Sequence, residues 1–442
     1  MAGRAATRTA SSCRVVGNAA RGRAVVGKAV EVGVTRSVCR TVDGPTVGPP
    51  ARGRVVHPIG TGGRTPSARP VVATVSRVPD NLPGTASPLP LDRPAPAAVI
   101  AAVGVHLPER TVDVREAEQA LAARCPGAAP RVPMVSRLTG VRRVHVLPDD
   151  WDASDLAVAA AEKLLAAQGM APADVDLLIF AAASQDMVEP ATSHIVAAKL
   201  GVRAPVMDVK NACNSVLNAI EVAEALIAGG RYATVLVACG EAPSRAVRWD
   251  VPDRATYLLS APGYTMSDAG AAVLVRRAVA ADVEARAADG GPAPRGILAS
   301  AFGAESSHWD VGMLPGGGTA HPRDLERTYF EIDGSRLREA FLALGPGVVL
   351  DALDRAGVMW DDVALVAVHQ VAVSYLDDVH AALGLPTGRT LVTVADHGNV
   401  ASATLPLQLA TALETGRVGP GDVVVLVGLA GGISIGATVV RL

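Results

Sequence analysis

The sequence predicts a layered α/β fold that is built from two copies of one structural unit. From about residue 97, apolar runs of strand length alternate with Ala- and Leu-rich stretches of helical length. Asp174 and Asp362 open similar apolar runs, 188 residues apart. Cys213 and Asn399 lie 186 residues apart, and each precedes a Gly-Arg turn by a similar interval. Internal repetition of this kind predicts two similar halves that pack against each other.

Composition narrows the class of protein. The 442 residues carry a net charge of −2 and only 3% aromatic side chains, which argues against a nucleic-acid binder. Five cysteines without a CxxC pair argue against a disulfide scaffold or a metal site and favour a reducing cytoplasm. The uncharged run 423–440 contains four glycines, so we interpret it as two buried strands around a turn and expect no membrane span.

The first 95 residues differ from the rest. They contain fourteen Arg and Lys against four acidic residues, about +10, so the remainder carries about −12. Gly, Pro, Ser and Thr are frequent and no apolar period persists, which predicts a disordered basic extension. It can be an organelle transit peptide, a polyanion-binding arm, or the product of a start site assigned too far upstream. We favour the last of these.

The first half is expected to contain a regular series of elements. Ser154 or Asp155 is a plausible cap for the first long helix, and Pro190 and Gly201 mark the start and end of the second. In order, the expected elements are a strand in 97–110, a helix in 154–170, a strand in 174–184, a helix in 189–201, a strand in 205–212, a helix in 213–230 and a strand in 232–241.

Cys213 is the candidate nucleophile, because it falls where a strand ends and a helix begins. The N–H groups and positive dipole end of a helix favour a thiolate. A thiolate at that place can attack a thioester, and its own backbone N–H can point at the resulting oxyanion. The plainer interpretation is a small core residue, since a lone Cys among alanines is more often buried for packing.

Three further positions complete the candidate site. His369 ends the first strand of the second half, and Asn399 lies in a His-Gly-Asn turn. The two side chains can donate hydrogen bonds to a second oxyanion, such as a thioester enolate. Gly431 or Gly432 can bring a backbone N–H close without an obstructing Cβ. Each feature is weak alone, but their positions at equivalent turns of a repeat favour a functional role.

Several segments resemble the thiolase superfamily, specifically its ketoacyl synthase III branch, over nearly all of 97–442. The resemblance implies a thiolase-like fold in five layers, α-β-α-β-α, with halves at 96–275 and 276–442. It also implies that Cys213, His369 and Asn399 form the Cys-His-Asn triad of the family. The segments are LTGVRR (138–143), DVKNACNSVLNAIEVAEALIAGG (208–230), MSDAGAAVLV (266–275), VHQV (368–371), DHGNVASATLP (396–406) and the terminal 421–442.

Two departures point to a subgroup. Fatty-acid-initiating members continue from the histidine as His-Gln-Ala-Asn, whereas here Val371 and Ala372 follow Gln370, and no early tryptophan is present to stack an adenine. The segment 184–202 instead resembles the head-to-head condensing enzymes of olefin biosynthesis. In those enzymes a glutamate of this motif reaches the partner subunit's active site as a base, which makes Glu189 a candidate. Its alternative role is that of a carboxylate beside a helix N-terminus.

The expected reaction is acyl transfer to Cys213 followed by Claisen condensation to a β-ketoacyl thioester, with acyl groups on coenzyme A or acyl carrier protein. The carbanion arises by loss of carbon dioxide from a malonyl thioester, or by proton abstraction with Glu189 as base. No metal or redox cofactor is implied. One alternative is transfer of the acyl group to an alcohol or amine without a new C–C bond. Another is a scaffold whose basic arm is the working part.

Two expectations concern partners. Arg245, Arg248 and Arg254 follow a predicted strand and are candidates for contacts to a nucleotide phosphate or a carrier protein, although a solvated loop is the plainer interpretation. The resemblance also implies a homodimer, formed by pairing of the strand 232–240 with its copy.

Overall fold

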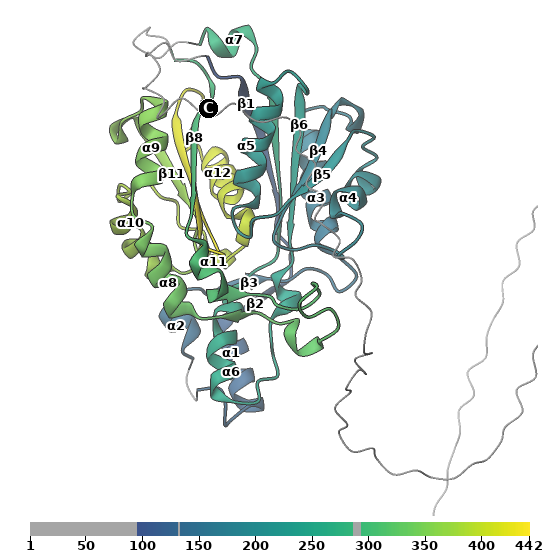
Figure 1. The fold of residues 1–442 in the computed structure, drawn as a ribbon, viewed down its shortest axis with the longest axis vertical. Helices are drawn as coiled ribbons and strands as arrows, with labels where there is room; N and C mark the ends of the chain where they lie inside the picture. Colours follow the sequence, from purple (N-terminus) through teal and green to yellow (C-terminus); the bar gives the residue numbers. More distant parts are fainter. Residues whose placement is uncertain (1–94, 131–132, 286–292) are drawn as a thin grey trace, which may run out of the picture. The chain divides into compact units, whose positions relative to one another are not determined.

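The computed structural model describes residues 95–442 except 131–132 and 286–292. The expectations for residues 1–94, including disorder, lie outside the described residues. Two large sheets organise the chain (Figure 1). The first contains, in spatial order, β1 (Ala98–His106), β7 (Ala269–Arg277), β6 (Thr234–Glu241), β4 (Leu177–Ala181) and β5 (Val206–Val209). The second contains β11 (Val363–Val368), β12 (Val423–Ala430), β13 (Ser434–Arg441) and β8 (Gly296–Ala304).

The two sheets repeat one pairing pattern. In the first, β4 is parallel to β6, which is antiparallel to β7, which is antiparallel to β1. In the second, β11, β12, β13 and β8 follow the same sequence of orientations. β5 is parallel to β4 and extends only the first sheet. The duplication that the sequence spacing predicted is therefore confirmed at the level of sheet topology.

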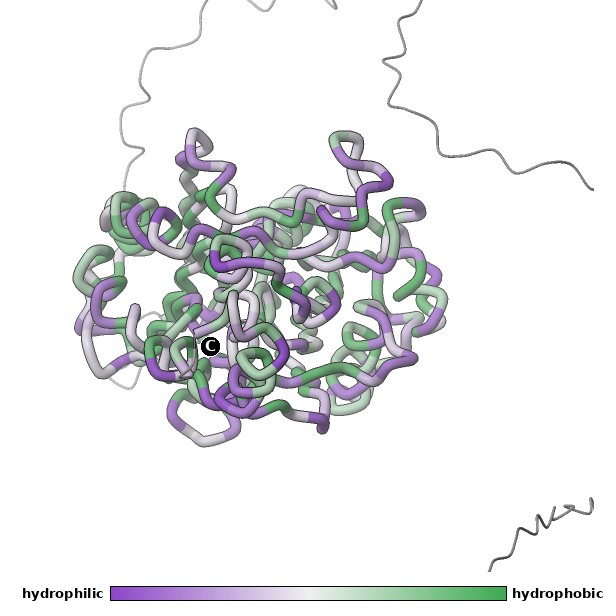
Figure 2. The backbone as a smooth tube through the Cα atoms, turned by 90° about the horizontal axis from the view of Figure 1, so that it is seen from below, coloured by the Kyte–Doolittle hydropathy of each residue, from purple (hydrophilic) through white to green (hydrophobic). Residues whose placement is uncertain are grey.

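Helices complete five layers, as predicted (Figure 1). Helices α5 (Ser215–Ala228) and α12 (Thr404–Glu414) lie between the sheets. Most positions of α12 are buried, whereas α5 exposes a stripe that contains Glu221 and Ala225. On the outer face of the first sheet lie α3 (Ala153–Ala167) and α4 (Thr192–Leu200). On that of the second lie α9 (Gly347–Ala356), α10 (Leu376–Leu383) and α8 (Gly334–Ala343). In Figure 2 hydrophobic and hydrophilic residues alternate along much of the backbone, as expected for helices and strands that pack one face on the core.

Helix α3 lies unusually close to its sheet because two glycines face it. Gly240 of β6 and Gly270 of β7 are directly opposed in the ladder. A Cβ at either position would collide with the backbone carbonyl oxygens of Ala153 or Leu156 in α3. The helix matches this approach with alanines at its buried positions. The close contact fixes α3 against β6 and β7, two inner strands of the first sheet.

Two predicted helix starts differ from the structure. The cap of α3 is Asp152, and Asp155 closes a capping box by accepting from the Asp152 backbone N–H at 2.9 Å; the expected cap was Ser154 or Asp155. Helix α4 begins at Thr192, so Pro190 precedes the helix and does not occupy its first turn. The helix ends at Gly201 with φ +77°, as predicted.

A smaller cluster of elements lies at one end of the sheets (Figure 1, bottom). It has its own core around Leu121, Tyr257 and Tyr264. The core packs beneath the paired strands β2 and β3 and supports one wall of the site described below. Its elements are α1 (Val114–Arg124), α2 (Val135–Thr139), α6 (Arg254–Ser260), β2 (Thr111–Asp113), β3 (Arg143–His145) and α11 (Val394–His397). The remaining elements are α7 (Ala280–Val283), β9 (Gly312–Met313) and β10 (Glu331–Ile332).

Two further expectations are settled by the strands. The uncharged run 423–440 forms the hairpin β12–β13, as predicted, and no helix among the described residues is both long and apolar enough to cross a bilayer. The strand 232–240 was expected to pair across a dimer, and this is wrong. It forms β6, which is bonded on one side to β7 and on the other to β4. A strand with both edges occupied cannot pair with another chain.

Candidate active site

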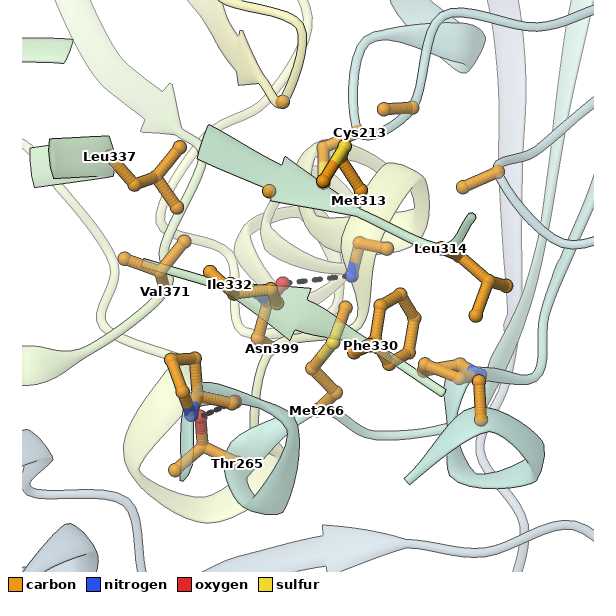
Figure 3. A pocket seen from close by; sticks show the side chains of 18 of the residues that line it. Cys213, Thr265, Met266, Met313, Leu314, Phe330, Ile332, Leu337, Val371 and Asn399 are labelled. Atoms are coloured by element: carbon orange, nitrogen blue, oxygen red, sulfur yellow. Dashed lines mark hydrogen bonds between the residues drawn. The ribbon is translucent and has the colours of Figure 1, made fainter. Parts of the chain in front are cut away.

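One cavity of about 1470 Å³ brings several of the sequence-predicted residues together, among them Cys213 and Asn399 (Figure 3). Cys213, His369 and Asn399 all line it, and so does Gly431. Gly432 is not among the lining residues. It turns the β12–β13 hairpin together with Ile433, and the two have φ values of +84° and +52°. The cavity therefore contains a thiol, an imidazole, a carboxamide and a glycine backbone from four separate segments.

Cys213 lies just before the N-terminus of helix α5, and contacts of its neighbour with the terminal hairpin hold it there. Its neighbour Asn214 donates from Nδ2 to Ser434 Oγ at 3.0 Å. Opposite, a Cβ at Gly428 would collide with the Asn214 side-chain oxygen, so a larger residue at this strand position would displace the Asn214 side chain. On the other side of the cysteine, Ala212 adopts φ +44°, a left-handed conformation that alanine rarely takes. The candidate nucleophile thus occupies a tightly determined turn.

Asn399 lies at the corresponding turn before α12. Its side-chain oxygen accepts from the backbone N–H of Ala401 at 3.0 Å, which turns the carboxamide NH2 away from that bond. Ala401 has φ +48°, so both equivalent turns contain a left-handed alanine. The two turns are joined directly, because the Val216 N–H in α5 donates to Ser402 Oγ at 2.8 Å.

His369 follows β11 and is 4% exposed. Its backbone N–H donates to Val427 of the neighbouring strand at 2.9 Å, which fixes the position of the residue. Both ring nitrogens are buried without a protein partner in the described part of the chain. Burial lowers the pKa of His369 to about 4. The imidazole is therefore neutral at ordinary pH and offers an N–H to whatever enters the cavity.

The sequence predicted that Cys213 is a thiolate, and for the protein without substrate this prediction is wrong. Burial raises the pKa of Cys213 to about 12, and the carboxylate of Glu241 adds to this shift. A hydrogen bond from the backbone of the cysteine itself acts in the opposite direction but is the smaller effect. Desolvation thus outweighs the helix N-terminus, and Cys213 is a thiol at neutral pH.

Glu241 is a site residue that sequence reasoning missed. It ends β6, is 1% exposed and lines the cavity. Its carboxylate accepts from the backbone N–H groups of Ala183 and Ser184 at 2.8 and 3.1 Å, and from Ser402 N–H at 3.3 Å. These bonds tie the loop after β4 to the loop of Asn399. The only signal in the sequence is an acidic residue directly after an apolar strand.

The walls of the cavity are largely apolar (Figure 3). An arm that includes β9 and β10 contributes Met313, Leu314 and Phe330. At the rim, Leu138 of α2 and Leu258 of α6 remain 59% and 50% exposed. Large apolar side chains that stay exposed beside a cavity are typical of a binding site for an apolar ligand.

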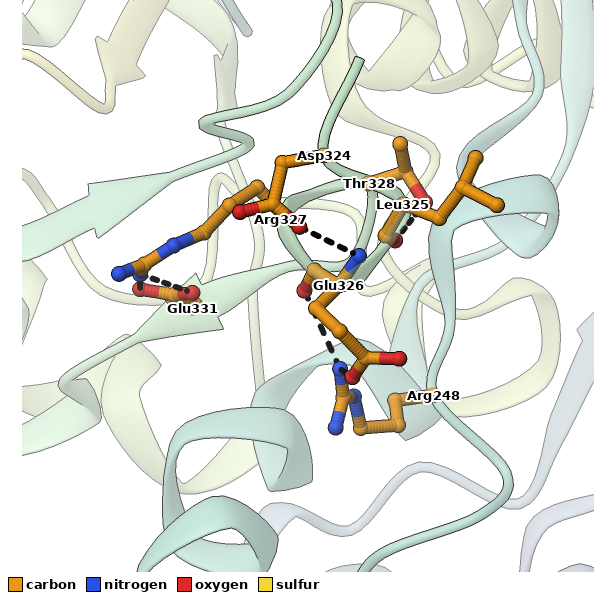
Figure 4. Close-up of polar contacts among 7 residues, drawn as sticks. All are labelled: Arg248, Asp324, Leu325, Glu326, Arg327, Thr328 and Glu331. Carbon is orange, nitrogen blue, oxygen red and sulfur yellow. Dashed lines mark hydrogen bonds and ion pairs between the residues drawn. The ribbon is translucent and has the colours of Figure 1, made fainter. Parts of the chain in front are cut away.

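The three candidate arginines occupy different positions. Arg245 lines the cavity, but its Nη2 lies within hydrogen-bond distance of three carbonyl oxygens in the turn at 148–151. Arg248 is outside the lining and binds Glu326 Oε2 at 2.7 Å, which holds the arm over the cavity (Figure 4). Arg254 begins α6, is exposed and lies over the ring of Tyr257.

Glu189 does not line the cavity of its own chain. It lies in an exposed loop between β4 and α4, together with the exposed Met187 and Val188. The loop ends where helix α4 begins, and there the backbone N–H groups of Thr192 and Ser193 donate to the Asp208 carboxylate in β5 at 2.9 and 2.8 Å. Glu189 thus lies three residues before this contact with β5, the outermost strand of the first sheet.

The duplicated sheets form a thiolase-like fold, and one cavity of this fold is lined by Cys213, His369 and Asn399. A family model described as 3-oxoacyl-[acyl-carrier-protein (ACP)] synthase III matches residues 207–289, and the model of its C-terminal part matches 353–442. The beta-ketoacyl-[acyl-carrier-protein] synthase III of Dinoroseobacter shibae is 32% identical over 345 residues, 78% of this chain and 98% of the relative. The one of Rhizorhabdus wittichii is 33% identical over 346 residues, 78% and 99% of the two chains. The chain belongs to the beta-ketoacyl-[acyl-carrier-protein] synthase III family.

Solved structures agree with this assignment. The 3-oxoacyl-(acyl carrier protein) synthase III FabH of Pseudomonas aeruginosa PAO1 is similar with a TM-score of 0.64 and 28% identity, over 78% of this chain and 98% of the other. OleA of Xanthomonas campestris, in its E117A form, is similar with a TM-score of 0.67 and 20% identity, over 78% and 98%. At that identity the second likeness concerns the fold.

Proposed function

We propose that this enzyme condenses two thioesters in two half-reactions, with Cys213 as the nucleophile and His369 and Asn399 as the oxyanion donors of the second half. The observation that carries the proposal is that the three side chains meet on one apolar cavity. In this proposal the halves 96–275 and 276–442 each supply one side of the site. The enzyme acts in the cytoplasm on acyl groups that are bound to coenzyme A or to a carrier protein.

In the first half-reaction, the Cys213 sulfur attacks the carbonyl carbon of an acyl thioester. The bond from that carbon to the carrier sulfur breaks, and the proton of the Cys213 thiol leaves with the free carrier thiol. The backbone N–H of Cys213, and that of Gly431, are the proposed donors to the oxyanion. Because the pKa of Cys213 is about 12, the thiol loses its proton only as the substrate reacts.

In the second half-reaction, a malonyl thioester loses carbon dioxide, and its remaining electron pair forms an enolate. The neutral His369 N–H and the Asn399 NH2 donate hydrogen bonds to the enolate oxygen. The enolate carbon attacks the acyl-Cys213 carbonyl, the carbon–sulfur bond breaks, and the cysteine takes up a proton. A β-ketoacyl thioester is released, and none of these steps transfers electrons to a cofactor.

Glu189 is the proposed base for a second, non-decarboxylative route, in which it removes an α-proton from a plain acyl thioester. It would act in the cavity of a partner subunit. The support is its exposure in the loop before α4, whose first N–H groups bond β5, and β5 ends the first sheet among the described strands. We accordingly propose a homodimer that pairs at β5 and not at β6. A free strand edge is the part of a sheet that can extend into another chain.

The substrate that the cavity fits best is a thioester with a long apolar acyl chain. The exposed leucines at the rim and the methionine and phenylalanine of the arm provide the contact surface. Arg254 is the arginine that we propose for a phosphate of the carrier, since Arg248 is engaged by Glu326 and Arg245 by three carbonyl groups.

Product analysis by mass spectrometry tests the proposal. The purified full chain receives long-chain acyl-coenzyme A alone, then the same with malonyl-coenzyme A or malonyl carrier protein. Product from acyl-coenzyme A alone that disappears in Glu189→Gln supports the non-decarboxylative route, provided that Glu162→Gln, an exposed carboxylate on α3, retains activity. Product only with a malonyl donor supports the decarboxylative route. Acylated Cys213 that yields no condensation product, but passes its acyl group to an alcohol or amine, contradicts the proposal.

A further inference from the structure

Two histidines form a contact directly beside the Asn399 turn. His145 ends β3, and His397 ends α11, two residues before Asn399. Their rings stack with centroids 5.3 Å apart and an interplanar angle of 15°, and His145 Nε2 lies 3.0 Å from His397 Nδ1. The contact joins segments that are 252 residues apart, and the reaction proposed above does not use either ring.

Neighbouring groups determine which nitrogens carry protons. His145 Nδ1 lies 2.7 Å from the carbonyl oxygen of Pro108, which can only accept, so Nδ1 carries a proton. In the neutral ring Nε2 is then the acceptor, and His397 must donate to it from Nδ1. The pair tolerates one added proton, because either ring can then donate to the other. A second proton leaves two N–H groups facing each other, and the contact opens.

The backbone of His145 is also connected to that of Asn399. The His145 N–H donates to Ser267 Oγ at 2.7 Å, and the Ser267 N–H donates to the Asn399 carbonyl at 2.9 Å. The Asn399 N–H in turn donates to the Thr265 carbonyl at 2.8 Å. Gly398 is enclosed by this frame, since a Cβ there would lie within 2.9 Å of Thr265, Ser267 and Val144 atoms. A displacement of either histidine therefore displaces Asn399.

We propose that His145 and His397 are positioning residues for Asn399, and that a second proton on the pair suppresses condensation while leaving acyl transfer to Cys213 in place. The inference rests on the function proposed above, in which Asn399 serves only the second half-reaction. It predicts that the ratio of the two half-reactions depends on pH, because only one of them needs the Asn399 carboxamide.

Both positively and negatively charged side chains surround His145 and His397. Arg143 faces both rings, Asp268 acts on His145, and Asp396 acts on His397. Asp396 is itself held by Arg142 through bonds of 2.9 and 2.5 Å. Burial is the largest influence on both rings and lowers the pKa of each below its usual 6.5. Both rings are therefore neutral near pH 7, and the proposed loss occurs on the acid side.

The test measures both half-reactions of the full-length chain between pH 5 and 8. Acylation of Cys213 by long-chain acyl-coenzyme A is followed by intact-protein mass, and the β-ketoacyl product is followed after addition of the second thioester. The variant is His397→Gln, which keeps a donor but does not titrate. The control is His380→Gln, another buried histidine, whose Nε2 bonds Thr390 Oγ1 at 3.0 Å in α10 and away from Asn399.

In the wild-type chain and in the control, the ratio of condensation to acylation should fall by up to about tenfold per pH unit once the second proton binds. In His397→Gln the ratio should depend much less on pH. If this ratio decreases at low pH as strongly in His397→Gln as in the wild type, the inference is overturned and the proposed function stays intact. Absence of any condensation product at all pH values overturns the proposed function itself.

A second measurement guards against a variant that does not fold. Nitrogen NMR of labelled histidines in the wild-type chain reports the tautomer of each ring and its titration. The inference requires a proton on Nδ1 of both His145 and His397, and two separate titration steps. A proton on Nε2 of His145 at neutral pH, or one step shared by both rings, contradicts it.

Discussion

The backbone N–H of Val216 donates a hydrogen bond of 2.8 Å to the side-chain oxygen of Ser402, although the two residues are 186 positions apart. Both are buried. Val216 lies in the first turn of the helix that follows Cys213, and Ser402 lies three residues after Asn399. This one bond joins the two equivalent turns of the duplicated fold and fixes Cys213, the proposed nucleophile, relative to the Asn399 carboxamide.

Removing this bond should uncouple the two turns. In Ser402→Ala the Val216 N–H is left buried without its acceptor, which we expect to cost about 1–3 kcal/mol of unfolding free energy. Condensation should fall by more than acylation of Cys213, because Asn399 moves relative to the acyl group. Denaturant unfolding and the two half-reaction rates measure both effects. Ser300→Ala, which removes a hydroxyl from β8, is the control, and equal activity losses in the two variants would refute the role of the bond.

The approach of α3 to the first sheet should tolerate no side chain. Gly240→Ala introduces a Cβ that collides with the Ala153 carbonyl, so we expect a loss of about 1–3 kcal/mol or more. Gly127→Ala is the matched control, since a Cβ at that position would meet nothing within 4 Å and its φ is not left-handed. Thermal unfolding of both variants measures this loss of stability. Equal stability of Gly240→Ala and the wild type would contradict the close packing.

The raised pKa of Cys213 predicts slow alkylation at neutral pH. Because the thiol keeps its proton up to about pH 12, the rate of reaction with iodoacetamide should rise steadily through pH 8, 9 and 10. The rate is measured on the peptide that contains Cys213, with Cys125, which is partly exposed like Cys213, as the internal reference. A plateau of the Cys213 rate near pH 7 would show that the helix N-terminus outweighs desolvation.

The ion pair of Arg248 with Glu326 should hold the arm over the cavity. Arg248 is 13% exposed and also lies 4.5 Å from the centre of the Tyr329 ring. Arg248→Met releases both contacts, so we expect KM for the acyl thioester to rise several-fold while kcat changes less. Arg355→Met removes an exposed pair with Asp351 on the outer helix α9 and should leave KM unchanged. Steady-state kinetics of the two variants provide the comparison.

The buried imidazole of His369 should reduce stability in acid. Its pKa of about 4 in the folded chain lies below the usual 6.5, so the unfolded chain takes up a proton that the folded chain excludes. Stability is therefore complete above about pH 6.5 and decreases as the pH falls towards 4, by up to about 3 kcal/mol. His369→Leu should flatten this dependence in denaturant titrations, whereas the exposed His308→Leu should not.

Much of the architecture was accessible from the sequence because its signals are local or periodic. The 186-residue offset between Cys213 and Asn399 predicted equivalent turns, and the structure brings both to one cavity. The apolar run 423–440 with its internal glycines predicted the terminal hairpin. Each of these inferences needed only the order of apolar residues and turn signals along the chain.

The parts that sequence reasoning missed depend on distant segments. The acid–base state of Cys213 is set by burial and by Glu241, whose carboxylate binds loops at Ala183 and Ser402. The position of β6 inside the sheet depends on β7, which is contributed by a later segment. The contact of His145 with His397 likewise appears only when β3 packs on α11. No local sequence pattern predicts contacts between such distant segments.

The most direct test of the account follows the fate of Cys213. The full-length chain is incubated with long-chain acyl-coenzyme A, digested and analysed by mass spectrometry, before and after addition of malonyl-coenzyme A. The account predicts an acyl group on the Cys213 peptide that disappears as a β-ketoacyl thioester forms, and neither species in Cys213→Ala. An acyl group on another residue, or product formed by Cys213→Ala, would contradict it.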